Sequence, residues 1–411
     1  MNYTKSPVRA AAAAAGAILG KGDYADRAIE YGLNENRHWS PSEKSTYVNL
    51  TYELVRWLRL MLEIEPCPTS RGKYMYALGI YMTLKGMPLD PEEFPEPFDA
   101  EKLKARFEVL SAERRIKESI PDWLDEMGHR ELGDAWPPLL AALNKPASII
   151  LRTNTLKTTP TALRASLENA GIPSFPVPEV ETALMLDEFY NVFTLSLFHN
   201  GYFEVQDTGS QMIAPFVDAR PGMRIIDACA GTGGKTLHLA ALMQNKGRII
   251  ALDTAVWKLD ALKQRATRAG VTIVETKPIE TTKVIKRLAG TADRVLIDAP
   301  CSGLGVLRRN PDAKWRMTAS KVQKLIGEQK EILDSYHRMV KPGGMLIYAT
   351  CSILPSENRI QVDNFLATHP EFTLVEDKIL GPDTTNSDGF YMARMLKSDA
   401  STSSSELKKS E

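Results

Sequence analysis

The spacing of apolar residues predicts helices in the first part of the chain. Between residues 42 and 64, apolar positions recur every three or four residues, which places them on one face of a helix. These positions are Tyr47, Leu50, Tyr52, Leu54, Val55, Leu58 and Met61. Prolines at positions 66, 68, 88, 91, 95 and 97 mark breaks between helices. We therefore expect residues 1–145 to form an all-α domain.

The pattern changes near residue 147. Residues 147–156 are typical of a strand, and a helical stretch follows with Thr159 or Thr161 as its N-cap and Gly171 as its C-cap. Residues 191–207 contain β-rich pieces around an Asn-Gly pair. Residues 146–217 are therefore expected to form a small α/β module.

From Pro221 onward, short β-branched runs alternate with helical stretches. The predicted strands are residues 223–229, 247–253, 271–276, 293–300 and 343–351. Alternation of this kind predicts an α/β fold with a parallel sheet covered on both faces, over residues 218–397. The polar, low-complexity residues 398–411 are expected to be a disordered tail.

Charge is distributed unevenly along the 411 residues. The whole chain has 51 Lys and Arg against 51 Asp and Glu, but residues 218–345 have 23 basic and 12 acidic side chains. A basic catalytic half suits an anionic substrate, although solvated helix faces would give the same excess.

Composition excludes several classes of protein. Four cysteines form no disulfide framework, which indicates a reducing compartment such as the cytoplasm. No CxxC pair occurs and there are six histidines, so no metal site is expected. No apolar run reaches the length of a membrane span, and we expect no membrane association. Residues 5–20 outline a signal peptide, but alanine dominates them and no convincing cleavage site follows, which favours a helix.

The sequence RIIDACAGTGGKT, residues 224–236, predicts a strand that enters a nucleotide-binding turn. A Walker loop requires a glycine five residues before Gly234, where this chain has Cys229. A dinucleotide fingerprint requires a third glycine at position 236, which is threonine. S-adenosylmethionine also binds at such a turn, and Asp253, at the end of the next strand, suits its ribose hydroxyls. Enzymes that bind NAD share this acid, so the turn alone leaves hydride transfer open.

Two cysteine motifs favour the methyl donor. DAPCSGLG (residues 298–305) and YATCS (residues 348–352) each follow a predicted strand, so Asp298, Cys301 and Cys351 can meet at one edge of the sheet. Carbon 5 of cytosine becomes nucleophilic when a thiolate adds to carbon 6, and the reaction needs a carboxyl group and a base nearby. The alternative is that both cysteines are buried and inert.

These motifs resemble the NOL/NOP/Sun family of RNA cytosine-5 methyltransferases. The matching pieces are VQDTGSQ (205–211), DACAGTGGKT (227–236), ALDT (251–254), DAPCSGLGVLRRNPDAKW (298–315), KPGGMLIYATCSILPSEN (341–358) and DGFYMARM (388–395). The resemblance implies a Rossmann-like class I methyltransferase sheet, preceded here by the all-α domain and the small α/β module, which would recognise RNA. It also implies S-adenosylmethionine as cofactor.

The resemblance also implies roles for single residues. Cys351 would be the nucleophile, and Cys301 would assist the later elimination, although DNA cytosine methyltransferases use the Pro-Cys cysteine as nucleophile. Asp298 would contact the base and the methionine end of the donor, with Lys235 beside the reaction centre. The residues implied in cofactor binding are Cys229, Ala230, Gly231, Thr232, Gly233, Gly234, Lys235, Asp253 and Asp298. Those implied in RNA binding are Arg308, Arg309, Lys314 and Trp315.

Two departures from the family pattern affect the cofactor site. Residues 231–234 are GTGG where the family usually has APGG, which keeps the turn but changes its rigidity. The family usually has an acid after the third strand, whereas this chain has Thr276 and Lys277, with Glu275 and Glu280 nearby. Which of these residues contacts adenine stays open.

Residues 24–57 are similar to the helical RNA-binding domain of bacterial members, which is related to an antitermination factor. This similarity favours 16S ribosomal RNA as substrate. We also expect the enzyme to be a monomer. Transfer RNA, and an inactive RNA-binding assembly factor with the same fold, are the alternatives.

Overall fold

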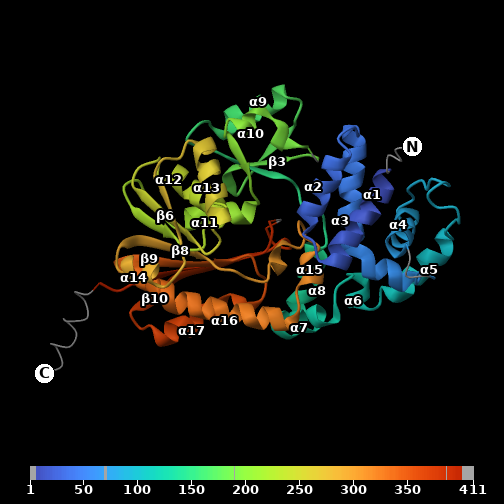
Figure 1. Ribbon diagram of the computed structural model, residues 1–411. Coiled ribbons are helices and arrows are strands. Elements are labelled where there is room, and N and C mark those ends of the chain that lie inside the picture. The colour runs from blue at the N-terminus through green and yellow to red at the C-terminus, as the bar shows by residue number, and fades with distance from the viewer. Residues whose placement is uncertain (1–5, 69–71, 189, 386, 400–411) are drawn as a thin grey trace. The chain divides into compact units, whose positions relative to one another are not determined.

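The computed structural model describes residues 6–68, 72–188, 190–385 and 387–399. The chain folds into two compact units (Figure 1). The first contains residues 1–146 and 306–321, and the second contains residues 147–305 and 322–411. Residues 306–321, which follow the Pro-Cys motif, therefore pack with the N-terminal helices. The tail predicted for residues 398–411 lies, from residue 400 onward, outside the described part of the chain.

The first unit is helical, as its apolar spacing predicts. Its elements are α1 (Pro7–Gly16), the π-helix η1 (Ala17–Lys21), α2 (Ala25–Glu35), α3 (Pro41–Ile64), α4 (Lys73–Leu84), α5 (Ala100–Leu110), α6 (Arg114–Lys117), α7 (Asp122–Leu132), η2 (Gly133–Ala135), α8 (Trp136–Leu143) and α15 (Ala313–Arg316). Helix α3 begins with a capping box, in which the Ser40 hydroxyl accepts from the Glu43 N–H and the Glu43 carboxylate accepts from the Ser40 N–H. Its apolar face buries Tyr47, Leu50 and Leu54 in the core of this unit.

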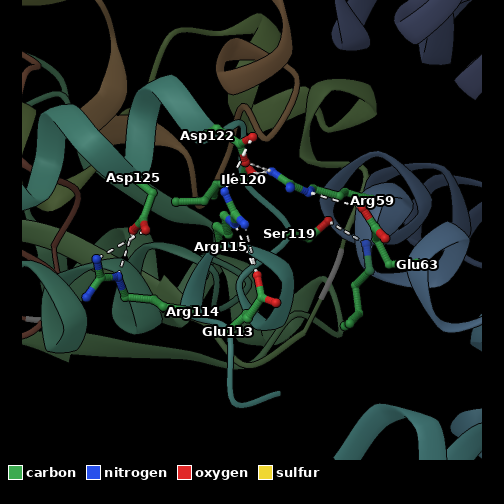
Figure 2. Close-up of polar contacts among 10 residues, drawn as sticks. Arg59, Glu63, Glu113, Arg114, Arg115, Ser119, Ile120, Asp122 and Asp125 are labelled. Carbon is green, nitrogen blue, oxygen red and sulfur yellow. Dashed lines mark hydrogen bonds and ion pairs between the residues drawn. The ribbon is translucent and has the colours of Figure 1, made fainter. Parts of the chain in front are cut away.

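Polar contacts join α3 to the segment around α6 and α7 (Figure 2). Arg59 Nη1 donates to the Ile120 carbonyl and to Asp122 Oδ1, both at 2.6 Å. Arg114 makes two hydrogen bonds with Asp125, at 2.7 and 3.1 Å. Asp125 also accepts from the indole N–H of the fully buried Trp136. The two-pronged Arg114–Asp125 pair fixes the orientation of α6 on α7 as well as their distance, and the two Arg59 bonds join α3 to the start of α7.

The second unit contains a small antiparallel sheet of order β2-β3-β1-β4. Its elements are β1 (Ile150–Thr153), α9 (Pro160–Asn169), β2 (Ser174–Val177), β3 (Val180–Leu186), η3 (Val192–Thr194), α10 (Ser196–His199) and β4 (Phe203–Val205). Thr159 caps α9 as predicted, with its hydroxyl accepting from the Ala162 N–H at 3.2 Å. The β-rich interpretation of residues 191–207 is wrong before the Asn-Gly pair, where η3 and α10 form instead. Leu195 and Phe198, three residues apart, pack on the sheet's core from this helical turn.

The large sheet of the second unit has seven strands in the order β10-β11-β9-β8-β5-β6-β7. They are β5 (Arg224–Asp227), β6 (Arg248–Asp253), β7 (Val274–Pro278), β8 (Ala292–Asp298), β9 (Val340–Thr350), β10 (Phe372–Leu380) and β11 (Phe390–Lys397). The five from β9 to β7 pair in parallel, and β11 is antiparallel to both its neighbours. This is the Rossmann-like sheet that the alternating pattern predicts.

Helices cover both faces of this sheet. They are α11 (Thr208–Phe216), α12 (Gly234–Leu242), α13 (Val256–Ala269), α14 (Lys283–Arg287), α16 (Ala319–Tyr336) and α17 (Arg359–Thr368), with the short turns η4 (Leu304–Val306), η5 (His337–Met339) and η6 (Pro355–Glu357). Figure 1 shows α11, α12 and α13 on one face and α16 and α17 on the other. Among the described residues, no helix has both the length and the hydropathy that a membrane span requires.

Candidate active site

The glycine turn lies between β5 and α12. Gly231 and Gly233 have φ values of +53° and +92°, a left-handed conformation that residues with a Cβ rarely adopt. The turn is held from both sides, because the Ala230 N–H donates to the Leu252 carbonyl and Arg265 donates to the Thr232 carbonyl and hydroxyl. A Cβ on Gly231 would meet nothing within 4 Å, so the outer face of the turn is open. An open turn of this kind can accept a ligand against its backbone.

Asp253, at the end of β6, faces this turn. Its Oδ2 accepts from the Gly231 N–H at 3.0 Å, and its Oδ1 accepts from the Ala255 N–H at 2.8 Å. Each carboxylate oxygen keeps a second acceptor position, and a ribose offers two hydroxyl donors. The turn and this carboxylate therefore fit the nucleoside part of S-adenosylmethionine.

The strand register shows which residues of β7 lie near Asp253. Pro278 pairs with Asp253, and the Ile279 N–H donates to the Asp253 carbonyl at 2.9 Å. Glu275 pairs with Ile250, nearer the start of the strand, and is bound by Arg248 and Lys277. Ile279 and Glu280, rather than Glu275, are therefore at the edge of the sheet that carries Asp253.

The two cysteine motifs meet at the same edge of the sheet. Asp298 ends β8 and pairs with Ala349 of β9, so the loops after both strands emerge side by side. The Sγ atoms of Cys301 and Cys351 are 3.3 Å apart, and the Gly305 N–H donates to the Cys351 carbonyl at 3.0 Å. The sulfur atoms thus lie together, as the position of both motifs at strand ends predicts.

An ion pair lies at this edge as well. Lys235, in the first turn of α12, has its Nζ 2.6 Å from Asp298 Oδ2, and the Lys235 side chain is 13% exposed. Burial alone would lower the pKa of Lys235, but the Asp298 carboxylate, with smaller contributions from Cys351 and Asp227, raises it above its usual value. Lys235 is therefore a fixed positive charge near the cysteines at neutral pH.

Cys301 and Cys229 favour the protonated thiol. The hydrogen bond with Cys351, burial, and the charges of Cys351 and Glu357 all raise the pKa of Cys301 well above its usual value. Burial, with the charges of Asp227, Asp298 and Asp253, does the same for the pKa of Cys229. Neither thiol is activated as a nucleophile in this environment.

A set of buried polar residues behind the cysteines has no role in the sequence-based prediction. It consists of Ser302, Gln329, Ser352, Glu357 and Asn358, all buried. One feature of the sequence could have pointed to this buried set. Glu357 and Asn358 lie six and seven residues after Cys351, beyond the predicted strand that Cys351 ends.

The residues expected to bind RNA lie in the first unit, and two of them bond to backbone carbonyls of α3. Lys314 is 1% exposed, and its Nζ donates to the Arg56 carbonyl at 2.8 Å. The Trp315 indole N–H donates to the Val55 carbonyl at 2.7 Å, and its ring packs on the helical core. Both polar groups are therefore bonded inside the unit, with Lys314 buried and Trp315 partly buried, and RNA binding by these residues stays a prediction. Arg308 is also buried, with Nη2 donating to the Pro146 carbonyl, and Arg309 is half-buried.

Replacing Lys314 with methionine is expected to alter the pH dependence of stability. Burial and the charge of Arg56 lower the pKa of Lys314 well below its usual value. An exposed lysine in the unfolded chain has a pKa of about 10.4. At pH values between the lowered pKa of folded Lys314 and about 10.4, the unfolded chain therefore binds a proton that the folded chain does not. The free energy of unfolding of the wild type then rises with pH relative to that of the variant, by up to about 1.4 kcal/mol per pH unit.

Denaturant titrations between pH 7 and 10 measure this difference. Lys321 donates to a backbone carbonyl in the same way but is exposed, so Lys321→Met is the matched control and should show no pH-dependent difference. A flat difference for Lys314→Met would show that the buried amine keeps its charge.

Replacing Gly233 with alanine is expected to weaken S-adenosylmethionine binding by about tenfold or more, because a displaced turn loses its approach to the ligand. The new Cβ would lie 2.5 Å from Leu262 Cγ, so the turn or α13 must move. Isothermal titration calorimetry measures the affinity. Gly222 has a φ of +90°, and a Cβ added there would meet no atom within 4 Å. Gly222→Ala therefore imposes similar strain without the clash and should keep its affinity.

Two sequence families match separate segments of this chain, and single relatives match about two thirds of it. The family described as 16S rRNA methyltransferase RsmB/F matches residues 214–400, and the ferredoxin-like domain of RsmF/B-like methyltransferases matches residues 120–193. A probable ribosomal RNA small subunit methyltransferase B from Synechocystis is 34% identical over 298 residues, which are 68% of this chain and 67% of that protein. Ribosomal RNA small subunit methyltransferase B from Vibrio cholerae is 34% identical over 67% of this chain and 65% of its own length. The chain thus spans about two thirds of the length of these relatives.

Solved structures share the fold. The crystal structure of a protein called PH0851 superposes with a TM-score of 0.81, at 26% identity, over 97% of this chain and 100% of its own. NSun6 from Pyrococcus horikoshii has a TM-score of 0.62 at 21% identity, over 67% of this chain and 98% of its own, and supports the fold alone.

Proposed function

We propose that this chain, which belongs to the RsmB/F family of 16S rRNA methyltransferases, transfers a methyl group to carbon 5 of a cytosine in 16S ribosomal RNA. As a member of this family it is an S-adenosylmethionine-dependent methyltransferase. The observation that carries the cytosine chemistry is the pair of thiols 3.3 Å apart, at the edge of the sheet that also bears the Lys235–Asp298 pair and the glycine turn.

In this proposal the glycine turn, Asp253 and Asp298 bind the cofactor. Residues 229–235 would line the ligand, Asp253 would accept from its ribose hydroxyls, and Asp298 would lie near its methionine end. S-adenosylmethionine supplies the electrophilic methyl group that carbon 5 takes up.

Cys351 would begin the reaction by adding its thiolate to carbon 6 of the cytosine. The carbon–sulfur bond forms while the electrons of the 5,6 double bond move to carbon 5, which becomes nucleophilic. The fixed positive charge of Lys235 would stabilise the thiolate and the negative charge that develops on the ring, and the Asp298 carboxylate would accept from the amino group of the base. The charge of Cys351 is among those that raise the pKa of Lys235, after the Asp298 carboxylate, which supports placing the nucleophile beside this ammonium group.

Cys301 would complete the reaction by moving protons. Once carbon 5 carries its methyl group, the proton on carbon 5 must leave before the carbon–sulfur bond can break. In this proposal that proton passes to Cys301 while the proton of Cys301 passes to the departing Cys351 sulfur, so the 5,6 double bond is restored and no charge is left behind. The short distance between the two sulfur atoms supports such a transfer.

Bisulfite sequencing of ribosomal and transfer RNA from a strain that lacks the gene tests the proposal. We expect one methylated cytosine of 16S ribosomal RNA to disappear and to return with the wild-type gene. If a methylated cytosine disappeared from transfer RNA instead, the proposed chemistry would stand and transfer RNA would be the substrate. An unchanged map, together with tight RNA binding and no consumption of S-adenosylmethionine by the purified protein, would show a binding factor instead.

A further inference from the structure

The fully buried carboxylate of Glu357 lies behind the two cysteines. Glu357 is 0% exposed and ends the short turn η6 that follows Cys351. Its Oε1 accepts from the Ser302 N–H at 2.8 Å and from Gln329 Nε2 at 3.0 Å. Its Oε2 accepts from the hydroxyls of Ser302 and Ser352. Four donors therefore converge on one carboxylate, which compensates for its removal from water.

These donors come from three separate segments of the chain. Ser302 directly follows Cys301, and Ser352 directly follows Cys351, so one carboxylate binds the neighbour of each cysteine. Gln329 belongs to α16 and also donates to the Pro300 carbonyl at 3.0 Å, on the other side of Cys301. The two serine hydroxyls are 3.3 Å apart, the same separation as the two sulfur atoms.

The backbone of Glu357 is held by the strand that carries Cys351. The Tyr348 hydroxyl donates to the Glu357 carbonyl at 2.7 Å. The next residue, Asn358, accepts from the Thr350 hydroxyl and donates to the Ser352 carbonyl at 2.9 Å. The carboxylate is therefore anchored to the Cys351 loop and reaches across to the Cys301 loop.

We propose that Glu357 is a positioning residue that sets the distance between the two thiols by binding the serine next to each of them. It touches neither thiol and acts through Ser302 and Ser352. The proposal deepens the proposed function and rests on it, because the proton transfer between the sulfur atoms requires this distance. The charge of Glu357 also contributes to keeping Cys301 as a thiol.

Two substitutions separate the geometry from the charge. In Glu357→Gln the amide oxygen can take the place of Oε1 and accept from the Ser302 N–H and from Gln329. The amide NH₂ can then donate to the two serine hydroxyls, which turn to accept. The loops stay joined without the negative charge. In Glu357→Ala all four donors lose their acceptor, and the two cysteine loops lose the contacts that pass through this carboxylate, while the backbone bond from Gly305 to Cys351 remains.

Oxidation by diamide measures the thiol distance without RNA or cofactor. Diamide takes two electrons and two protons from Cys301 and Cys351, and peptide mapping by mass spectrometry quantifies the disulfide that forms. We expect Glu357→Ala to slow this reaction by at least about tenfold, since small displacements of reacting atoms cost large factors in rate. Glu357→Gln should stay within about threefold of the wild type by the same reasoning.

Glu204 offers a matched control for the loss of a buried carboxylate. It is 4% exposed and accepts from Arg265 and Arg268, away from the cysteine loops. Glu204→Ala should lower the melting temperature while leaving the rate of disulfide formation unchanged. If Glu357→Ala does not fold, the double variant Ser302→Ala with Ser352→Ala removes both hydroxyl contacts and should slow the reaction instead.

The outcomes distinguish this inference from the proposed function. A wild-type rate of disulfide formation in Glu357→Ala, or in the double serine variant, would overturn the positioning role even if the enzyme methylates cytosine. A slowed rate in these variants, with rescue in Glu357→Gln, would support the positioning role even if RNA proved not to be methylated at carbon 5.

Discussion

Replacing Cys351 with alanine is expected to abolish methyl transfer, while replacing Cys301 with alanine should trap a covalent complex between protein and RNA. Without Cys351 no thiolate adds to carbon 6, and carbon 5 stays a poor nucleophile. Loss of an essential nucleophile lowers turnover by about 10⁴-fold or more. Without Cys301 the adduct still forms on Cys351, but the proton transfers that release it fail, so the adduct accumulates.

Two measurements separate these outcomes. Transfer of a radioactive methyl group from S-adenosylmethionine to 16S ribosomal RNA reports turnover, and denaturing electrophoresis detects the RNA that migrates with the protein. Cys67 lies in the helical unit, in the part of the chain that precedes α4, so Cys67→Ala is the matched control and should behave as the wild type. If the two phenotypes were exchanged, Cys301 would be the nucleophile and the roles assigned here would be reversed.

Much of the candidate site could be predicted because its chemistry lies at strand ends. A short β-branched run followed by glycine or by Asp-Ala-Pro-Cys has a local signature, and parallel pairing brings the ends of neighbouring strands to one edge. The proximity of Cys301 and Cys351, and the bond between Asp253 and the turn at Gly231, follow from that rule. The roles of these residues in the reaction remain predictions, as do the domain boundaries.

Other features depend on partners far away in the sequence. The basic and aromatic residues after Arg308 have the composition of an RNA-binding segment. Only the fold shows that Lys314 and Trp315 bond to carbonyls of α3, some 258 and 260 residues earlier. Glu357 is likewise one of 51 acidic residues, and its role becomes visible only when three segments bring their donors to it. The residue type shows which bonds a side chain can make, whereas its partners in the fold determine which of these bonds it makes.

The helices and strands were predictable to different degrees for a similar reason. The pattern of α3 is long and periodic, so its helix is clear from the sequence. Residues 192–199 have a β-rich composition but form η3 and α10, because their apolar side chains reach the core of the small sheet from a helical turn. Over so short a stretch, tertiary packing outweighs propensity.

Replacing Lys235 with methionine is expected to lower kcat by about 10²- to 10³-fold, because a fixed charge aimed at a developing negative charge contributes that much in a site that excludes water. The variant also leaves Asp298 without its partner 2.6 Å away, so its carboxylate is free to reorient. Methyl transfer at saturating S-adenosylmethionine measures kcat, and calorimetry measures whether the cofactor still binds. The raised pKa of Lys235 keeps the wild-type charge constant below about pH 10.4, so the loss should be the same from pH 6 to 9.

A double-mutant cycle with Asp298→Asn tests whether the two residues act as a unit. If the ion pair holds one reactive arrangement, each single variant destroys it, and the double variant should be no slower than the worse of the two. Lys235→Arg keeps the charge but not the shape of the ammonium group, and should recover only part of the activity. Strictly additive losses would mean that Lys235 and Asp298 contribute separately. If Lys235→Met kept the wild-type kcat, the positive charge of Lys235 would have no role in the mechanism. The thiolate of Cys351 would then have to be stabilised by the loop backbone.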